Sequence, residues 1–150
     1  MATKPKVLVT GASGLIGGLV IRDLSDKYEF SGLSRRVVPG IVHTQAEIAD
    51  PSAIRKASQG MDMVLHLAAE THEYDDWDKV MQNTIGGTLN MFRAAQEAGV
   101  KRVVFMSTGS TMCGYEWYEG SPYGKLAANQ LQALPPGEKL LDYRDPPRPD

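Results

Sequence analysis

The sequence has little cysteine, almost no excess of charge and no long apolar run, and each of these absences excludes a class of protein. The single cysteine, Cys113, cannot form an internal disulfide, so the chain is expected in the reducing cytoplasm. A formal net charge of −2 provides no basic surface for nucleic acid. No apolar stretch approaches the ~20 residues of a membrane span, and the first residues lack the apolar core of a signal peptide.

The residues that are present have the composition of an ordinary globular domain. With 150 residues, 42% of them hydrophobic and 23% charged, the chain can bury one sizeable core. Short apolar runs alternate with helical patterns, which predicts an α/β fold: a doubly wound parallel sheet of about five strands with helices on both faces. The expected strands are residues 6–10, 30–34, 41–44, 62–67 and 102–106, and the expected helices are 15–27, 51–58 and 77–98.

The ends of the expected helices have recognisable signals. Asp50 precedes Pro51, a pair typical of a helix start, because aspartate caps a helix and proline suits its first position. Gly60 and Gly99 follow the second and third helices, where glycine commonly ends a helix. Asp50 is therefore expected to have a structural role.

The most informative segment joins the first expected strand to the first helix. Gly11, Gly14 and Gly17 recur there at intervals of three. This spacing predicts a sharp turn at a helix start, where free backbone N–H groups and the helix dipole can bind a pyrophosphate. Gly11 would permit the turn, Gly14 the approach of phosphate oxygens, and Gly17 the packing of helix on strand. An ordinary strand–turn–helix is the alternative, but the strand–helix units that follow favour a nucleotide site.

Four blocks of sequence together resemble one enzyme superfamily. The blocks are the glycine loop at residues 10–17, Asp62–Ala69, Asn83 with Gly87–Asn90, and Ala98–Thr108. In this order they are similar to the extended short-chain dehydrogenases/reductases, the NAD-dependent epimerase/dehydratase type. The resemblance implies a Rossmann fold, of which this chain is the N-terminal cofactor-binding portion. It also implies that a nicotinamide dinucleotide contacts Gly11, Ser13, Gly14, Leu15, Ile16 and Gly17.

The end of the second expected strand bears on the choice of cofactor. In doubly wound folds an acidic residue there, ~20 residues after the glycines, binds the ribose 2′-hydroxyl of NAD. Here Ser34, Arg35 and Arg36 occupy that place, and two guanidinium groups favour the 2′-phosphate of NADP. We therefore predict NADP, with NAD as the second choice. Two solvated loop charges without function are the alternative interpretation, and the missing carboxylate speaks against S-adenosylmethionine.

Further cofactor contacts are implied by the resemblance. It places the adenine slot at Glu47 and Ile48, although Glu47 is alternatively a merely exposed residue. It also places three residues after the fourth strand against the ribose: Leu67, Ala68 and Ala69. His66 precedes them inside an apolar strand, so we predict a hydrogen-bonded core histidine rather than a catalytic one. The acidic residues that follow match no metal-ligand spacing, and no metal is predicted.

The resemblance also implies the catalytic groups. The superfamily uses a tyrosine as general acid/base, a lysine one helical turn later that lowers the tyrosine pKa, and a serine or threonine that orients the substrate oxygen. Thr108 is the candidate for the orienting hydroxyl, and Ser107 is expected beside the cofactor. Asn83 matches an asparagine that holds a water or backbone group near the active site.

The tyrosine–lysine pair itself is absent. A lysine four residues later is lacking after each of Tyr115, Tyr118, Tyr123 and Tyr143. Residues 121–128 resemble the family segment with two residues lost, which would put Lys125 on the wrong helix face for Tyr123. Alternatively, the Pro-rich residues 142–150 resemble the segment just before the catalytic tyrosine, and the chain stops short of it. We favour this second explanation.

We therefore predict the cofactor-binding part of an NAD(P)-dependent oxidoreductase or epimerase/dehydratase, whose small-molecule substrate is a sugar nucleotide or similar sugar. The chain by itself is expected to bind a dinucleotide without turnover, and a non-catalytic dinucleotide-sensing or scaffold protein is the alternative.

We expect the core over residues 1–114 and an irregular tail over 115–150, with a short helix within 121–134. An uncovered fifth strand, and a long helix of the kind that pairs in this superfamily, predict a homo-oligomer.

Overall fold

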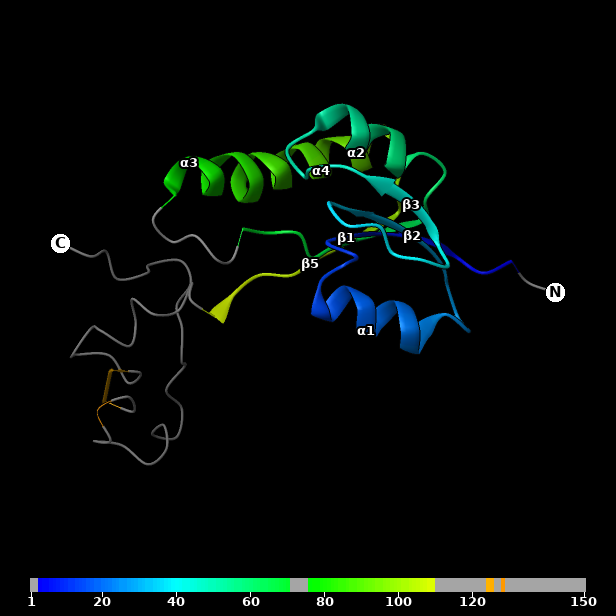
Figure 1. Cartoon of the computed structure of the whole chain (residues 1–150), viewed down its shortest axis with the longest axis horizontal. Helices are drawn as coiled ribbons and strands as arrows, with labels where there is room; N and C mark the ends of the chain where they lie inside the picture. Colours follow the sequence, from blue (N-terminus) through cyan, green and yellow to red (C-terminus); the bar gives the residue numbers. More distant parts are fainter. Residues whose placement is uncertain (1–2, 71–75, 110–123, 126–127, 129–150) are drawn as a thin grey trace. The chain divides into compact units, whose positions relative to one another are not determined.

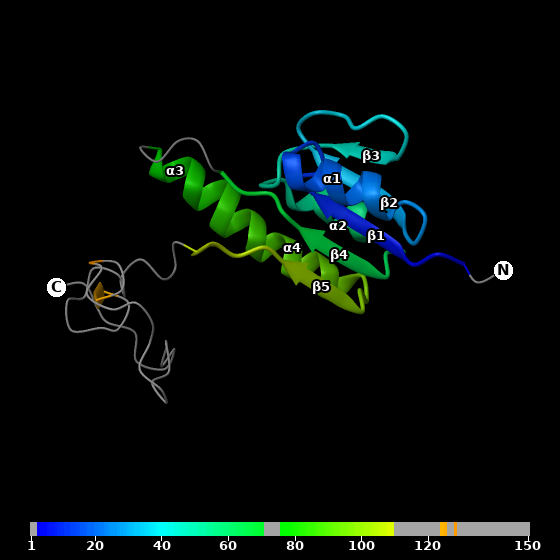
Figure 2. The ribbon, with the colours of Figure 1, turned by 90° about the horizontal axis from the view of Figure 1, so that it is seen from below.

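The computed structural model describes residues 3–70, 76–109, 124–125 and 128. The chain divides into two compact units, residues 1–106 and 107–150, and the fold described here is that of the first. Its five strands form one parallel sheet in the order β3-β2-β1-β4-β5 (Figure 2). The strands are β1 (Lys6–Thr10), β2 (Glu29–Ser34), β3 (Val42–Gln45), β4 (Met63–His66) and β5 (Arg102–Phe105). The predicted doubly wound sheet is confirmed, and every strand end lies within one residue of its expected position.

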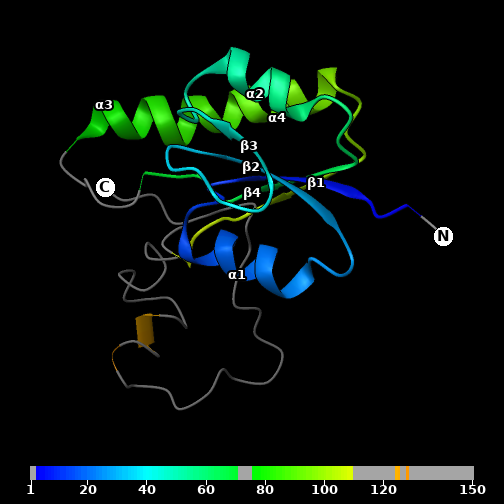
Figure 3. The ribbon, with the colours of Figure 1, turned by 45° about the vertical axis from the view of Figure 1, so that its right-hand side comes forward.

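Helices cover both faces of this sheet. In Figures 1 and 3, α1 lies on one face, while α2 and α4 lie on the other. The helical segments are α1 (Leu15–Leu24), α2 (Pro51–Ser58), α3 (Trp77–Lys79), η1 (Val80–Gly86) and α4 (Gly87–Glu97). A parallel sheet needs this double cover because its apolar strands are buried from both sides.

The central strand β1 shows why two separate cores form. Successive side chains of a strand point to opposite faces, so Val7 and Val9 belong to one core and Leu8 to the other. Leu8 packs in a cluster with Ile54 of α2 and Met91 of α4, all three fully buried. β1 therefore contributes to both cores. It pairs with β2 on one side and β4 on the other, so its carboxyl end lies between the carboxyl ends of these two strands.

The first expected helix ends three residues earlier than predicted, at Leu24 instead of Lys27. The N–H groups of Lys27 and Tyr28 both donate to the carbonyl oxygen of Leu24, at 3.0 and 3.1 Å. These bonds turn the chain directly into β2. The polar residues after Leu24 are compatible with a helix, and only the return of the chain to the sheet decides where it stops.

The predicted long helix over residues 77–98 is confirmed to Glu97, but its middle is not α-helical. Residues 80–86 form the π-helix η1 between α3 and α4, so its backbone bonds span five residues instead of four. Two glycines lie at the end of this segment. A Cβ on Gly86 would be 3.2 Å from the oxygen of Met81, and one on Gly87 would be 3.0 Å from the oxygen of Ile48. The spacing of apolar residues does not encode this close contact with the β3–α2 connection.

The expected cap of α2 is confirmed, and it allows a stability prediction. The carboxylate of Asp50 accepts hydrogen bonds from the N–H groups of Ser52 and Ala53, at 2.9 and 3.1 Å. Replacing Asp50 with alanine should lower the free energy of unfolding by about 1 kcal/mol, because two N–H groups lose their acceptor. Urea denaturation measures this difference. Asp50→Asn, which keeps the acceptor oxygen, should remain close to the wild type; an equal loss in both variants would contradict the capping role.

Several expectations concern the C-terminal part of the chain. The short helix within 121–134 and the tail over 115–150 lie, apart from residues 124, 125 and 128, outside the described residues, as does Cys113. Among the described strands β5 is an edge strand, and its Val104 and Phe105 are half exposed. The homo-oligomer stays a prediction. In the described part of the chain, no helix combines the length and apolar character needed to cross a bilayer.

Candidate dinucleotide site

The glycine loop connects β1 to α1 in a tight turn. Gly11 has a φ of +71°, and its N–H donates to the carbonyl oxygen of Leu33 on β2 at 2.9 Å. A Cβ at this position would lie 2.9 Å from the nitrogen of Ala68, so both the positive φ and the crowding require glycine. The N–H of Gly14 donates to the oxygen of Gly11 at 2.9 Å, and α1 begins at the next residue.

Gly17 is the point where α1 touches this loop. It is buried, and a Cβ on it would lie 2.7 Å from the oxygen of Gly11 and 2.9 Å from the Cα of Ala12. At the neighbouring Gly18 a Cβ would meet nothing within 4 Å. The helix thus packs on the loop residues Gly11 and Ala12 directly after β1 instead of on the strand itself, and the approach of phosphate to Gly14 stays a prediction.

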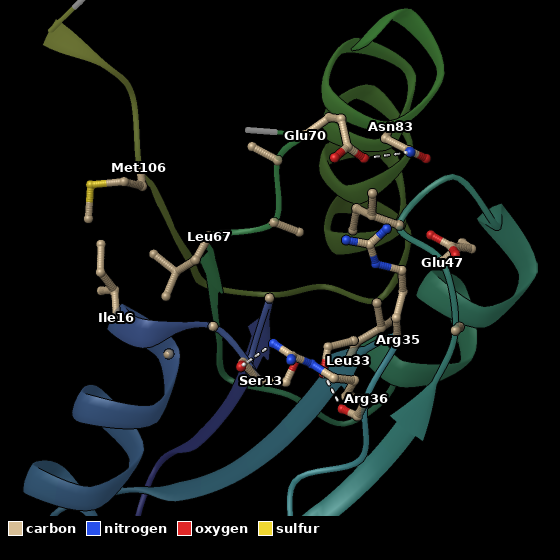
Figure 4. A pocket seen from close by; sticks show the side chains of 18 of the residues that line it. Ser13, Ile16, Leu33, Arg35, Arg36, Glu47, Leu67, Glu70, Asn83 and Met106 are labelled. Carbon is tan, nitrogen blue, oxygen red and sulfur yellow. Dashed lines mark hydrogen bonds between the residues drawn. The ribbon is translucent and has the colours of Figure 1, made fainter. Parts of the chain in front are cut away.

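A cavity of about 450 Å³ opens at the carboxyl ends of β1, β2 and β4 (Figure 4). The residues predicted to contact the cofactor all line it: Gly11, Ser13, Gly14, Leu15, Ile16, Gly17, Ser34, Arg35, Arg36, Glu47, Ile48, Leu67, Ala68 and Ala69. Asn83 lines it too. Sequence reasoning missed four lining residues: Leu33, Ala46, Glu70 and Met106. Leu33 and Ala46 directly precede predicted contacts, so chain adjacency was the available signal for them.

The wall contributed by the end of β2 is basic. Arg35 and Arg36 are exposed and line the cavity, while Ser34 is 8% exposed. The Ser34 hydroxyl donates to the oxygen of Arg36 at 2.8 Å, and Nη2 of Arg36 donates to the oxygen of Ser13 at 3.3 Å. Glu47 is exposed and also lines the cavity, so both interpretations of that residue stay open.

His66, at the end of β4, is 1% exposed and has a hydrogen-bond partner at each ring nitrogen. Oγ1 of Thr10 lies 2.6 Å from Nδ1, and Oγ1 of Thr88 lies 3.0 Å from Nε2. The Thr10 oxygen also accepts from the N–H groups of Leu67 and Ala68, at 3.2 and 3.3 Å. Because these donors occupy its acceptor positions, the Thr10 hydroxyl donates to Nδ1, and the neutral ring has its proton on Nε2. The predicted core histidine is confirmed.

Burial lowers the pKa of His66 to about 4, because the charged ring would lose its hydration. The ring also stacks on Phe105 of β5, with centroids 5.6 Å apart. A neutral, enclosed imidazole is unsuited to proton transfer at neutral pH. Its hydrogen bonds instead connect β1, the loop after β4 and α4 beside the cavity.

A second polar cluster lies where the loop after β4 meets η1 (Figure 4). The N–H of Glu70 donates to Oγ1 of Thr84 at 2.9 Å, and Nδ2 of Asn83 donates to Oε2 of Glu70 at 3.3 Å. Asn83 thus donates to a side-chain carboxylate of the neighbouring loop, whereas the expected partner was a water or a backbone group near the active site. Its further part in catalysis stays a prediction.

The remaining predicted groups lie beyond β5. Ser107 and Thr108 follow Met106 directly, but they belong to the second unit, and their roles stay predictions. The tyrosines considered as general acid/base, Tyr115, Tyr118, Tyr123 and Tyr143, lie outside the described residues.

Comparison with known proteins identifies the family. The model of the NAD dependent epimerase/dehydratase family matches residues 7–132. The chain belongs to this family. It is 30% identical over 145 residues to an L-arabinose 1-dehydrogenase (NAD(P)(+)) of Haloferax volcanii, an alignment that covers 97% of the chain and 54% of the relative. It is 33% identical over 120 residues to a UDP-glucose 4-epimerase of Streptomyces lividans, with coverages of 71% and 36%.

Solved structures support the same assignment for this epimerase/dehydratase chain. A short-chain dehydrogenase/reductase superfamily protein from Agrobacterium tumefaciens with bound NAD superposes with a TM-score of 0.69 at 30% identity. The superposition covers 83% of the chain and 43% of that protein. The chain therefore spans about half, or less, of the length of the relatives it matches. Family members use a nicotinamide dinucleotide, and the relatives include sugar dehydrogenases and epimerases.

Proposed function

We propose that the chain is the dinucleotide-binding part of an NAD(P)-dependent oxidoreductase or epimerase/dehydratase, and that it prefers NADP to NAD. One observation supports this most directly. A single cavity joins the glycine loop at the start of α1 to two arginines at the end of β2. Free N–H groups at a helix start suit a pyrophosphate, and guanidinium groups suit a 2′-phosphate.

The other lining residues fit the remaining parts of such a dinucleotide. Ile48 is buried and offers an apolar surface for adenine, beside the exposed carboxylate of Glu47. Leu67, Ala68 and Ala69 present a wall without charge, against which a ribose can lie. Among the described residues, the wall at the end of β2 has no carboxylate that would repel a 2′-phosphate.

The chemistry of the complete protein is proposed by family membership. A bound dinucleotide would supply hydride exchange between nicotinamide C4 and a substrate carbon. Thr108 would orient the substrate oxygen, Ser107 would lie beside the cofactor, and Asn83 would hold the chain near the reacting groups. Because relatives are named for arabinose and UDP-glucose, we propose a sugar or sugar nucleotide as substrate. Without a Tyr-x-x-x-Lys pair in these 150 residues, binding without turnover is proposed for the chain alone.

Fluorescence titration with NADPH, NADH and S-adenosylmethionine tests the binding proposal. NADPH should bind at least about tenfold more tightly than NADH, since a charge-assisted hydrogen bond contributes roughly 1.5–3 kcal/mol. Equal affinities, or tighter NADH, would contradict the preference for NADP. If no dinucleotide bound at all, or S-adenosylmethionine bound best, the proposed function would be wrong.

The missing tyrosine–lysine pair favours one second candidate, a dinucleotide sensor or scaffold without catalysis. The coding DNA after Asp150 separates the two. A reading frame that continues into Tyr-x-x-x-Lys supports the enzyme, and a stop codon supports the sensor.

A further inference from the structure

The peptide between Ser13 and Gly14 is held at both of its polar ends. The N–H of Gly14 donates to the oxygen of Gly11 at 2.9 Å, and the carbonyl oxygen of Ser13 accepts from Nη2 of Arg36 at 3.3 Å (Figure 4). The N–H and C=O of a trans peptide point in opposite directions, so the two bonds together fix the plane of this peptide. That plane sets the direction in which α1 leaves the loop.

The backbone of Arg36 is itself anchored to the sheet. The hydroxyl of Ser34, the last residue of β2, donates to the carbonyl oxygen of Arg36 at 2.8 Å. The side chain of Arg36 makes one hydrogen bond to the described residues, and its partner is the carbonyl oxygen of Ser13.

The backbone of Arg35 is anchored like that of Arg36, but its side chain does not hold the glycine loop. Its carbonyl oxygen accepts from Nε2 of Gln45 at 2.9 Å, which holds the backbone against β3. Its side chain lines the cavity (Figure 4), and within the described part of the chain it has no hydrogen-bond partner. All of its donors therefore remain for a ligand.

We propose that the two arginines have different tasks: Arg36 is a positioning residue that holds the glycine loop in its binding geometry, and Arg35 recognises the 2′-phosphate. This inference rests on the proposed function, because it assigns tasks within the same dinucleotide site. Arg36 acts on the pyrophosphate end through the peptide of Ser13, so it affects NADH and NADPH alike. Arg35 affects only the ligand with the additional phosphate.

Titration of two single variants with NADH and NADPH separates these tasks. Arg36→Gln should weaken both ligands by a similar factor of about 5–10, because the peptide between Ser13 and Gly14 loses one of its two hydrogen bonds. Arg35→Gln should weaken NADPH by about 10–100-fold and NADH by less than about twofold. Arg93→Gln, which removes an exposed charge of α4 outside the cavity lining, is the matched control and should leave both affinities unchanged.

Hydrogen exchange provides a measurement that does not depend on the ligand. In the free protein, Arg36→Gln should speed amide exchange of Gly14 and its neighbours in residues 11–17, while Arg35→Gln should not. Unchanged exchange in Arg36→Gln, or a loss of NADPH affinity alone in that variant, would overturn the positioning role. Failure of the wild type to bind either dinucleotide would instead refute the proposed function, and the exchange data would still test Arg36.

Discussion

Replacing Gly17 with alanine should weaken dinucleotide binding by more than about tenfold and lower the free energy of unfolding by roughly 1–3 kcal/mol. The new Cβ would lie 2.7 Å from the oxygen of Gly11 and 2.9 Å from the Cα and oxygen of Ala12. These are backbone atoms and cannot rotate away as a side chain would. The start of α1 must therefore move from the loop, and its N–H groups would no longer converge on a bound pyrophosphate.

Gly18→Ala is the matched control for this prediction. The residue is the next in the same helix, but it is exposed, and a Cβ there would meet nothing within 4 Å. Alanine should stabilise the helix by up to about 1 kcal/mol and leave the affinity unchanged. NADPH titration and urea denaturation of both variants provide the comparison. Equal affinities of Gly17→Ala and Gly18→Ala would show that the helix start does not bind the pyrophosphate.

Acidification should destabilise the protein through His66. Its pKa is about 4 in the fold against about 6.5 when unfolded, so between these values the unfolded chain binds a proton that the folded chain does not. The free energy of unfolding contributed by this residue is complete above pH 6.5 and is lost as the pH falls towards 4. The loss amounts to about 3 kcal/mol. Protonation of Nδ1 would also remove the acceptor of the Thr10 hydroxyl, which orders the loop after β4.

Urea denaturation at several pH values between 7.5 and 4.5 tests this prediction. Carboxylates titrate in part of the same range, so the informative quantity is the difference between the wild type and His66→Gln, which lacks the titrating ring. Thr88→Val is the matched control: it removes the partner of Nε2 but keeps the imidazole buried, so it should lose stability at every pH and retain the wild-type slope. Identical slopes in wild type and His66→Gln would refute the assigned pKa.

The contents of the site could be predicted well because they follow strand ends. Residues directly after β1, β2 and β4 meet at one edge of a parallel sheet, so Gly11, Arg35 and Leu67 line one cavity although they are far apart in sequence. Met106 was missed because an apolar residue at the end of an apolar strand gives no signal of a ligand. Glu70 directly follows the predicted contact Ala69, so chain adjacency was a signal for it, whereas its hydrogen bonds with Asn83 and Thr84 of a distant helix could not be predicted.

The sequence by itself determined the alternation of strands and helices, the glycine turn and the family, because these depend on local spacing and on the conformations that single residues permit. Only the tertiary structure decided the π-helical turn of η1, the tautomer of His66 and the different tasks proposed for Arg35 and Arg36. The tautomer and the two tasks depend on contacts between distant segments: His66 with Thr10 and Thr88, and Arg36 with Ser13. Directly after η1, Gly87 likewise lies against Ile48. Such contacts exist only once the sheet has brought the strand ends together.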